Sequence, residues 1–164
     1  MDFEITPLLP QDWPQVREIF LQGVQTGLAT FETRVPAWGR WDAVHHPFAR
    51  LAARSGGLLL GWAALSPVSE RAAYAGVAEV SIYVRAGHRG LGLGKALLNE
   101  LVVASEAHGI WTLQAVIFAE NQASLRLHQA CGFRQVGRRE RIAKRDGNWL
   151  DTLLLERRSR QVGL

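Results

Sequence analysis

The spacing of apolar residues predicts the elements of the first third of the chain. Residues 3–9 have strand composition and end at Pro10. After Asp12, a predicted N-cap with Gln15 in the capping-box position, apolar residues recur at helical spacing to about residue 23. The residues on this predicted core stripe are Trp13, Val16, Ile19, Phe20 and Val24. A second helical segment is predicted over residues 38–53, and we expect Pro47 to start, kink or split it.

The rest of the chain alternates strand patterns with helical ones. Residues 58–65 form a continuous apolar run, which predicts a buried strand, and Gly61 within it marks a bulge or a close backbone approach. In the next predicted strand, 78–84, Glu79, Ser81 and Tyr83 share one face. The remaining predictions are a helix from residue 93, a strand over 111–117, a helix from Asn121 to about Gln129 with Gly132 as its C-cap, and a hairpin of strands 133–145 and 148–156 around Asp146-Gly147. The order predicts an α/β protein with a single mixed sheet, in one domain over residues 1–164.

Composition and charge allow several classes of protein. The chain has 164 residues, of which 48% are hydrophobic and 21% charged, and its net charge is +4. A basic run near the C-terminus suits either a solvated strand face or a polyanionic ligand; it comprises Arg138, Arg139, Arg141, Lys144 and Arg145. No apolar run approaches the roughly 20 residues of a membrane span, and the first residues lack a signal-peptide pattern, so we expect a cytoplasmic protein.

Neither the single cysteine nor the adjacent histidines predict a metal site. Cys131 has no partner for a disulfide within the chain, and its neighbours suggest packing. His45 and His46 are adjacent and would point to different helix faces, so we do not expect them to share a metal.

A glycine-rich segment, Arg89-Gly-Leu-Gly-Leu-Gly94, joins the predicted strand 78–84 to the helix that follows. Glycines permit close approach of a ligand to the backbone, and the start of a helix attracts anions, so a phosphate-bearing ligand fits here. A Walker loop would need Gly at Arg89 and Ser or Thr at Ala96. A dinucleotide fingerprint would need Gly or Ala at Lys95 or Leu97. Both templates fail, and the motif by itself also fits a loop without a ligand.

Two motifs resemble those of a known family. The Arg-x-x-Gly-x-Gly spacing resembles the pyrophosphate-binding signature of the GNAT acetyltransferases, and residues 121–133 look like the second GNAT signature, with an initial Asn and a final Gly-Phe. Four further stretches are similar to the phosphinothricin and methionine sulfone or sulfoximine N-acetyltransferase branch: Thr30–Glu32, Glu79–Val84, Leu127-His128 and Asn148–Thr152. The resemblance covers the whole chain.

The resemblance implies a single-domain GNAT fold, a mixed and mostly antiparallel sheet flanked by helices, whose splayed central strands bind acetyl-CoA. It implies direct acetyl transfer to the amino group of a small amino-acid-like substrate, without a metal, in a homodimer. Because a protonated amine cannot attack a thioester, a base must remove its proton; Glu79 is the candidate, although an ordinary strand carboxylate paired with Arg is the alternative.

The resemblance also implies roles for other residues. The backbone N–H of Val84 is the expected donor to the thioester oxygen. His128 stands where many GNAT enzymes have a Tyr, so we expect it near the cofactor thiol, and its role as an acid stays open. The cofactor residues are expected to be Ile82, Tyr83, Val84, Arg89, Gly90, Leu91, Gly92, Leu93, Gly94, Lys95, Asn121 and Ser124.

The candidates for substrate binding come from the chemistry of the substrate. An α-amino acid needs a cation for its carboxylate and a pocket for its side chain, which makes Arg71 with Tyr74, and Phe31 with Glu32, the candidates. For each of them the alternative is an ordinary residue of a surface loop.

Three other functions stay open from the sequence. A GNAT enzyme could act on another amine, such as a peptide N-terminus, a polyamine or an aminoglycoside. An acetyl-CoA sensor would keep the glycine loop without needing a base. A nucleic-acid-associated protein would bind in a strongly salt-dependent way.

Overall fold

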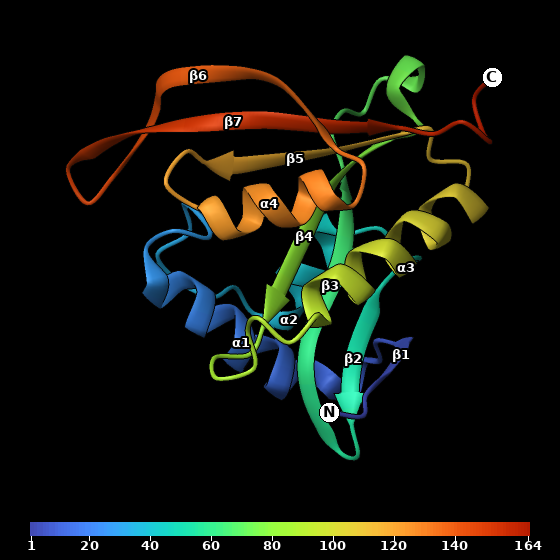
Figure 1. The fold of residues 1–164 in the computed structure, drawn as a ribbon, viewed down its shortest axis with the longest axis vertical. Helices are drawn as coiled ribbons and strands as arrows, with labels where there is room; N and C mark the ends of the chain where they lie inside the picture. The colour runs from blue at the N-terminus through green and yellow to red at the C-terminus, as the bar shows by residue number, and fades with distance from the viewer.

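A single seven-stranded sheet forms the centre of the molecule (Figure 1). The structure is a computed structural model that describes all residues from 1 to 164. The strands lie in the order β1-β2-β3-β4-β5-β7-β6; β4 pairs parallel with β5, and every other pair is antiparallel. The strands are β1 (Glu4–Pro7), β2 (Leu51–Ser55), β3 (Leu58–Pro67), β4 (Val77–Val84), β5 (Thr112–Phe118), β6 (Arg134–Arg145) and β7 (Asn148–Arg158).

Helices cover both faces of this sheet. On one face α1 (Trp13–Thr26) and α2 (Trp38–Val44) enclose a core cluster that contains Trp41 and Trp62. On the other face α3 (Leu93–Ala107) and α4 (Gln122–Ala130) pack over a larger core cluster, to which α3 contributes buried leucines at helical spacing. Two short 3₁₀ helices, η1 (Pro10–Asp12) and η2 (Ala72–Tyr74), lie in the connections. None of the helices is long and apolar enough to cross a bilayer.

Most predicted elements are present, with small shifts at their ends. The apolar run 58–65 lies within β3, where Gly61 is the predicted close approach: a Cβ there would lie 2.8 Å from the carbonyl oxygen of Tyr83. Asn121 caps α4 by accepting a hydrogen bond from the Ser124 N–H at 3.2 Å. The hairpin between β6 and β7 turns at Asp146 and Gly147, both with positive φ, as a type I′ turn requires.

The helix predicted over residues 38–53 is wrong in its second half. Helix α2 ends at Val44, and residues 51–55 form strand β2 between β1 and β3. The alanines there favour a helix locally. In the sheet, however, Ala52 and Ala53 pack into the core clusters on opposite faces, so both faces of the strand are buried. Packing outweighs the local propensity.

The predicted capping box at α1 is also wrong. The Asp12 side chain makes no cap bond to α1; it accepts a hydrogen bond from the Leu9 N–H at 2.7 Å and forms an ion pair with Arg54 of β2. The hydrogen bond from Arg54 holds the pKa of Asp12 below its ordinary value. Gln15 reaches away from the helix and accepts from the Leu59 N–H at 2.8 Å. Both side chains therefore fasten α1 to the sheet.

Candidate active site

The sheet opens into a fork between β4 and β5, which are the splayed strands that the family resemblance implies. The two strands pair at only three positions, Val77–Glu79 with Thr112–Gln114, and then diverge although both continue (Figure 1). The Arg85 N–H donates to Leu60 of β3 at 2.8 Å. Because successive N–H groups of a strand point to opposite edges, those of Ile82 and Val84 point into the fork, where β5 does not pair with them.

Glu79 lies at the last paired position before the fork opens. The side chain of Gln114, its register partner on β5, donates a hydrogen bond from Nε2 to Glu79 Oε1 at 2.9 Å. This bond fixes one carboxylate oxygen and leaves the other able to accept a proton. The sequence reasoning missed Gln114, because the register of two strands so far apart in the chain cannot be read from their patterns.

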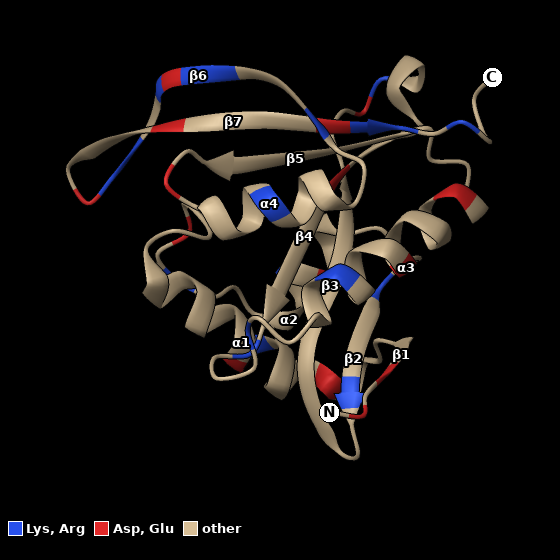
Figure 2. Cartoon of the chain, in the orientation of Figure 1, with Lys and Arg blue, Asp and Glu red and all other residues tan.

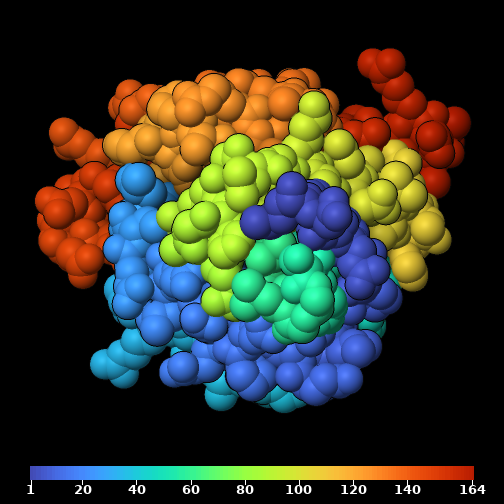
Figure 3. Space-filling view, turned by 60° about the horizontal axis from the view of Figure 1, so that its bottom comes forward, coloured from blue at the N-terminus to red at the C-terminus, as the bar shows by residue number.

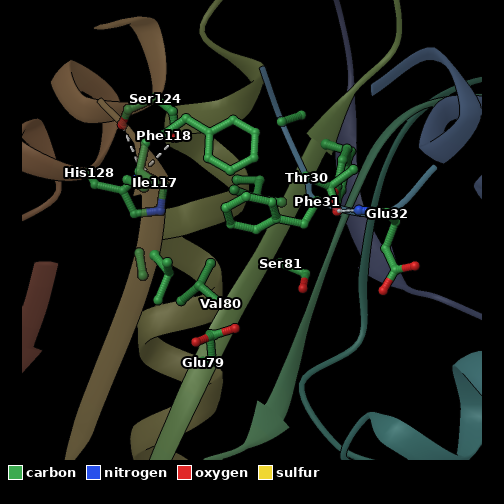
Figure 4. A pocket seen from close by; sticks show the side chains of 15 residues that line it. Thr30, Phe31, Glu32, Glu79, Val80, Ser81, Ile117, Phe118, Ser124 and His128 are labelled. Carbon is green, nitrogen blue, oxygen red and sulfur yellow. Dashed lines mark hydrogen bonds between the residues drawn. The ribbon is translucent and has the colours of Figure 1, made fainter. Parts of the chain in front are cut away.

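Two cavities meet at the polar face of β4. One of about 240 Å³ lies in the fork, and one of about 470 Å³ lies toward α2. Figure 4 shows Glu79 and Ser81 of β4 on one side of the fork cavity, with Ser124 and His128 of α4 on the other. The residues that line both cavities are Thr30, Glu32, Glu79, Ser81 and Tyr83. The predicted base therefore stands where the two spaces join.

His128 is buried at the fork, with 2% of its surface exposed. Its Nδ1 lies 2.8 Å from the carbonyl oxygen of Ser124, which can only accept, so we assign the proton of the neutral ring to Nδ1. Burial holds the pKa of His128 below its ordinary value, and the bond to Ser124 opposes this shift only in part. The Nε2 atom is buried without a hydrogen-bond partner. At neutral pH the ring therefore has an acceptor, and no spare proton, on its Nε2 side.

Tyr83 packs against the aromatic residues on the α1 side of the sheet. Its ring stacks on Phe20 and Trp62, with centroids 5.0 and 4.8 Å away. Gly23 of α1 makes room for it, since a Cβ there would lie 2.6 Å from the Tyr83 ring. Burial raises the pKa of Tyr83 to about 12, so its phenol stays protonated. The side chain thus forms a neutral wall between the cavities.

The glycine-rich segment forms an exposed loop at the end of β4. Gly90 and Gly92 have positive φ, +78° and +84°, which only glycine adopts readily, and Gly92 is the N-cap of α3. The Arg89 Nε donates to the Val84 carbonyl at 3.4 Å, so the loop folds back on the end of β4. The first N–H groups of α3, from Leu93 to Lys95, have no acceptor within the helix and are available to an anion. Leu91 is exposed beside them.

Gly94 has a different role from the other loop glycines. It lies inside α3, and a Cβ there would lie 3.1 Å from Leu127 of α4. A glycine at this position therefore allows α3 and α4 to pack closely. The two helices that carry the predicted cofactor residues lie side by side in front of the fork in Figure 1.

The predicted substrate residues are separated in this chain. Phe31 and Glu32 line the fork cavity, and the Phe31 ring meets Phe118 edge-on with centroids 4.5 Å apart. Arg71 is the N-cap of η2 and Tyr74 is its last residue; both are exposed and lie outside the lining of both cavities. The Arg71 guanidinium is 5.9 Å from the Tyr74 ring centroid.

Helix α2 supplies part of the larger cavity that the sequence reasoning missed. Arg40, Trp41, Val44 and His45 line it. His45 stacks on Trp41 at 4.2 Å, and burial holds the pKa of His45 below its ordinary value. His46 instead stacks on Phe48 at 4.6 Å, so the two adjacent histidines have different partners. The helical spacing of Trp41 and His45 was the one signal that could have placed them on a common face.

Comparison with known proteins relates this geometry to a family. Residues 13–133 match the model of the Acetyltransferase (GNAT) family. The chain is 34% identical over 153 residues to the phosphinothricin N-acetyltransferase of Alcaligenes faecalis, over 89% of this chain and 77% of that protein. It is 33% identical over 106 residues to an L-methionine sulfoximine/L-methionine sulfone acetyltransferase of Pseudomonas paraeruginosa, over 65% of this chain and 62% of that protein.

A solved structure extends the likeness to the whole fold. The crystal structure of a GNAT superfamily phosphinothricin acetyltransferase from Sinorhizobium meliloti, in complex with acetyl-CoA, matches with a TM-score of 0.90 at 31% identity. The match covers 99% of this chain and 91% of that one. The family match over residues 13–133 and the likeness to these relatives show that the chain belongs to the GNAT family of acetyltransferases.

Proposed function

We propose that the protein transfers the acetyl group of acetyl-CoA directly to the amino group of a small amino-acid-like substrate of the phosphinothricin or methionine sulfone type. The observation that carries this proposal is the position of Glu79, a residue that lines both the fork cavity and the larger cavity beside α2. The fork ends at the glycine loop and suits the acetyl-bearing arm of the cofactor, while the second cavity suits an acceptor. The names of the relatives support the choice of acceptor.

The residues of the fork suit acetyl-CoA in three respects. The N–H groups at the start of α3 and the Arg89 side chain supply donors for a pyrophosphate. The unpaired strand edge at Ile82 and Val84 supplies backbone groups for an amide-containing arm. Ser124 in the first turn of α4 lines the same opening, and Asn121 caps that helix.

In the proposed reaction, the acceptor amine transfers a proton to Glu79, directly or through a water molecule. The amine nitrogen then bonds to the thioester carbon and the carbon–sulfur bond breaks, so that coenzyme A leaves as a thiolate. The nitrogen loses its second proton as the amide forms, to the departing thiolate or to solvent. The N–H of Val84 donates to the carbonyl oxygen as it gains negative charge. His128 has no proton on its buried Nε2 to give at neutral pH, so the proposal requires no acid there. A thiol with an ordinary pKa near 8.5 is an adequate leaving group without one.

A screen of acceptors tests this proposal. Purified protein with acetyl-CoA should release coenzyme A thiol in the presence of phosphinothricin, methionine sulfone or methionine sulfoximine at millimolar concentration, and mass spectrometry should find one acetyl group on the α-nitrogen. Polyamines, aminoglycosides and peptides are the comparison acceptors. If only these are acetylated, the acceptor is an amine of another class. If acetyl-CoA binds and nothing is acetylated, the protein is an acetyl-CoA sensor. Sedimentation of the same sample tests the proposed homodimer.

A further inference from the structure

The segment that connects α1 to α2 carries Thr30, Phe31 and Glu32 into the cavities, yet its backbone is almost unsupported. No backbone–backbone hydrogen bond involves any residue from 28 to 36. The short local bonds are made by side chains: the Thr26 and Thr30 hydroxyls accept from the Leu28 and Glu32 N–H groups. The position of this segment must therefore be set by groups from elsewhere.

Two side chains from distant parts of the chain bind its carbonyl oxygens. Asn121, at the start of α4, donates from Nδ2 to Leu28 at 3.1 Å. Arg145, at the end of β6, donates from Nη1 to Thr30 at 2.8 Å and from Nη2 to Val24 at 2.9 Å. Figure 3 shows the tip of the β6–β7 hairpin beside the segment that follows α1, and Figure 1 shows the same proximity from another side.

Arg145 differs from the rest of the basic run on β6. Figure 2 shows that charged residues are spread along the hairpin, and most of the Arg and Lys side chains there are exposed. The Arg145 side chain is only 10% exposed, and its nearest carboxylate, Asp146, lies 3.6 Å from Nε. Its two forked Nη atoms are used on carbonyl oxygens, one of them in the last turn of α1, where the helix dipole favours a cation.

We propose that Arg145 is a positioning residue for the acceptor side of the site. Its bond to the Thr30 carbonyl sets the position of Thr30, Phe31 and Glu32. Its bond to the Val24 carbonyl holds these residues at a fixed distance from the end of α1. The expected effect on kinetics rests on the proposed function. Loss of the guanidinium should impair binding of the acceptor, because Thr30 and Glu32, which it would displace, line both cavities. The binding of acetyl-CoA at the glycine loop should change little.

The test compares Arg145→Ala and Arg145→Lys with Arg139→Ala. Arg139 is an exposed arginine on the same strand whose side chain makes no hydrogen bond or ion pair, so its replacement is a matched control. We expect Arg145→Ala to raise the KM for the acceptor about tenfold or more, as the loss of charge-assisted bonds predicts, while the dissociation constant of acetyl-CoA stays within about twofold. Lysine cannot reproduce the two-pronged contact, so Arg145→Lys should restore only part of the affinity. Added guanidinium ion should lower the KM of Arg145→Ala and leave that of Arg139→Ala unchanged.

Hydrogen exchange tests the positioning role without any acceptor. The amides to follow are the Leu28 and Glu32 N–H groups, which donate to the Thr26 and Thr30 hydroxyls. Faster exchange in Arg145→Ala than in Arg139→Ala supports the positioning role. This result does not depend on the proposed acceptor class, which is wrong if the wild-type protein acetylates no amino acid. Wild-type exchange together with a wild-type KM would overturn it. An equal loss of acceptor and acetyl-CoA binding, without rescue by guanidinium, would also overturn it, because it would indicate a general structural role.

Discussion

His128 shows how burial decides what a titratable residue can do. The same ring on the surface would exchange protons near neutral pH. Here burial lowers its pKa, and the Ser124 carbonyl orients the one proton away from the unpartnered Nε2. The sequence could place His128 near the reaction but could not indicate its protonation, since that depends on the burial and on the carbonyl.

The lowered pKa of His128 predicts a pH dependence of stability. The unfolded chain binds a proton at this residue near pH 6.5, and the folded chain does so only at lower pH. Below about pH 6.5 the unfolded state therefore binds more protons, and stability falls as the pH falls, by up to ~1.4 kcal/mol per pH unit for each such group. Denaturant titrations between pH 7.5 and 5 should show a shallower slope for His128→Asn than for the wild type. Equal slopes would show that His128 is not the group responsible.

Two arginines are candidates for binding the carboxylate of an amino-acid substrate. The sequence makes Arg71 a candidate; it is exposed beside Tyr74 and is the N-cap of η2, the segment that leads into β4. Arg40 lines the larger cavity. If Arg71 binds the carboxylate, Arg71→Ala should raise the KM for the amino acid about tenfold and that for its decarboxylated amine very little, since only the carboxylate contact is lost. If Arg40→Ala alone has this effect, the carboxylate binds beside α2 and the assignment of Arg71 is wrong.

At the scale of elements, the sequence predicted best where local pattern and packing agree. The β3 run, the α4 cap and the hairpin turn at Asp146-Gly147 need only neighbouring residues, and all three are present. Strand β2 was mispredicted because its alanines suit a helix, and only pairing with β1 and β3 makes it a strand. Gln114 and Arg145 were missed for a related reason, because each acts on a residue far away in the chain.

The conformation of Gly92, in the loop before α3, predicts how a substitution there affects the binding of acetyl-CoA. Gly92 has φ +84° and begins the helix, so Gly92→Val forces a β-branched residue into a left-handed conformation and adds bulk where the pyrophosphate must approach. Calorimetry should show acetyl-CoA binding weakened about tenfold or more. Arg89→Ala should weaken it less, since the backbone donors remain.

Gly109→Val is the matched control for the loop. Gly109 follows the other end of α3, also has positive φ, at +77°, and likewise has no atom within 4 Å of its would-be Cβ. The control should lose stability by a similar amount and keep its affinity for acetyl-CoA. Equal weakening by both substitutions would refute the placement of the pyrophosphate.

At the scale of the whole molecule, the fork in the sheet organises the site. Pairing of β4 with β5 ends at Glu79, and the opening beyond it creates one cavity toward the glycine loop while the far side of β4 borders another. A carboxylate at the closed end of the fork is held by Gln114 and lines both spaces. We propose that this carboxylate is the base.

The turnover number of Glu79→Gln is the most direct test of that claim. Glutamine keeps the size of the side chain and an oxygen for the Gln114 hydrogen bond, but it cannot accept the amine proton. With an acceptor found in the screen, we predict a fall in kcat of about 10²–10⁴-fold at neutral pH, unchanged acetyl-CoA affinity, and a deficit that shrinks as the pH approaches the pKa of the amine. Glu32→Gln, which removes the other carboxylate lining both cavities, should keep kcat within a few fold. Full turnover in Glu79→Gln would show that Glu79 is not the base and that the base lies elsewhere.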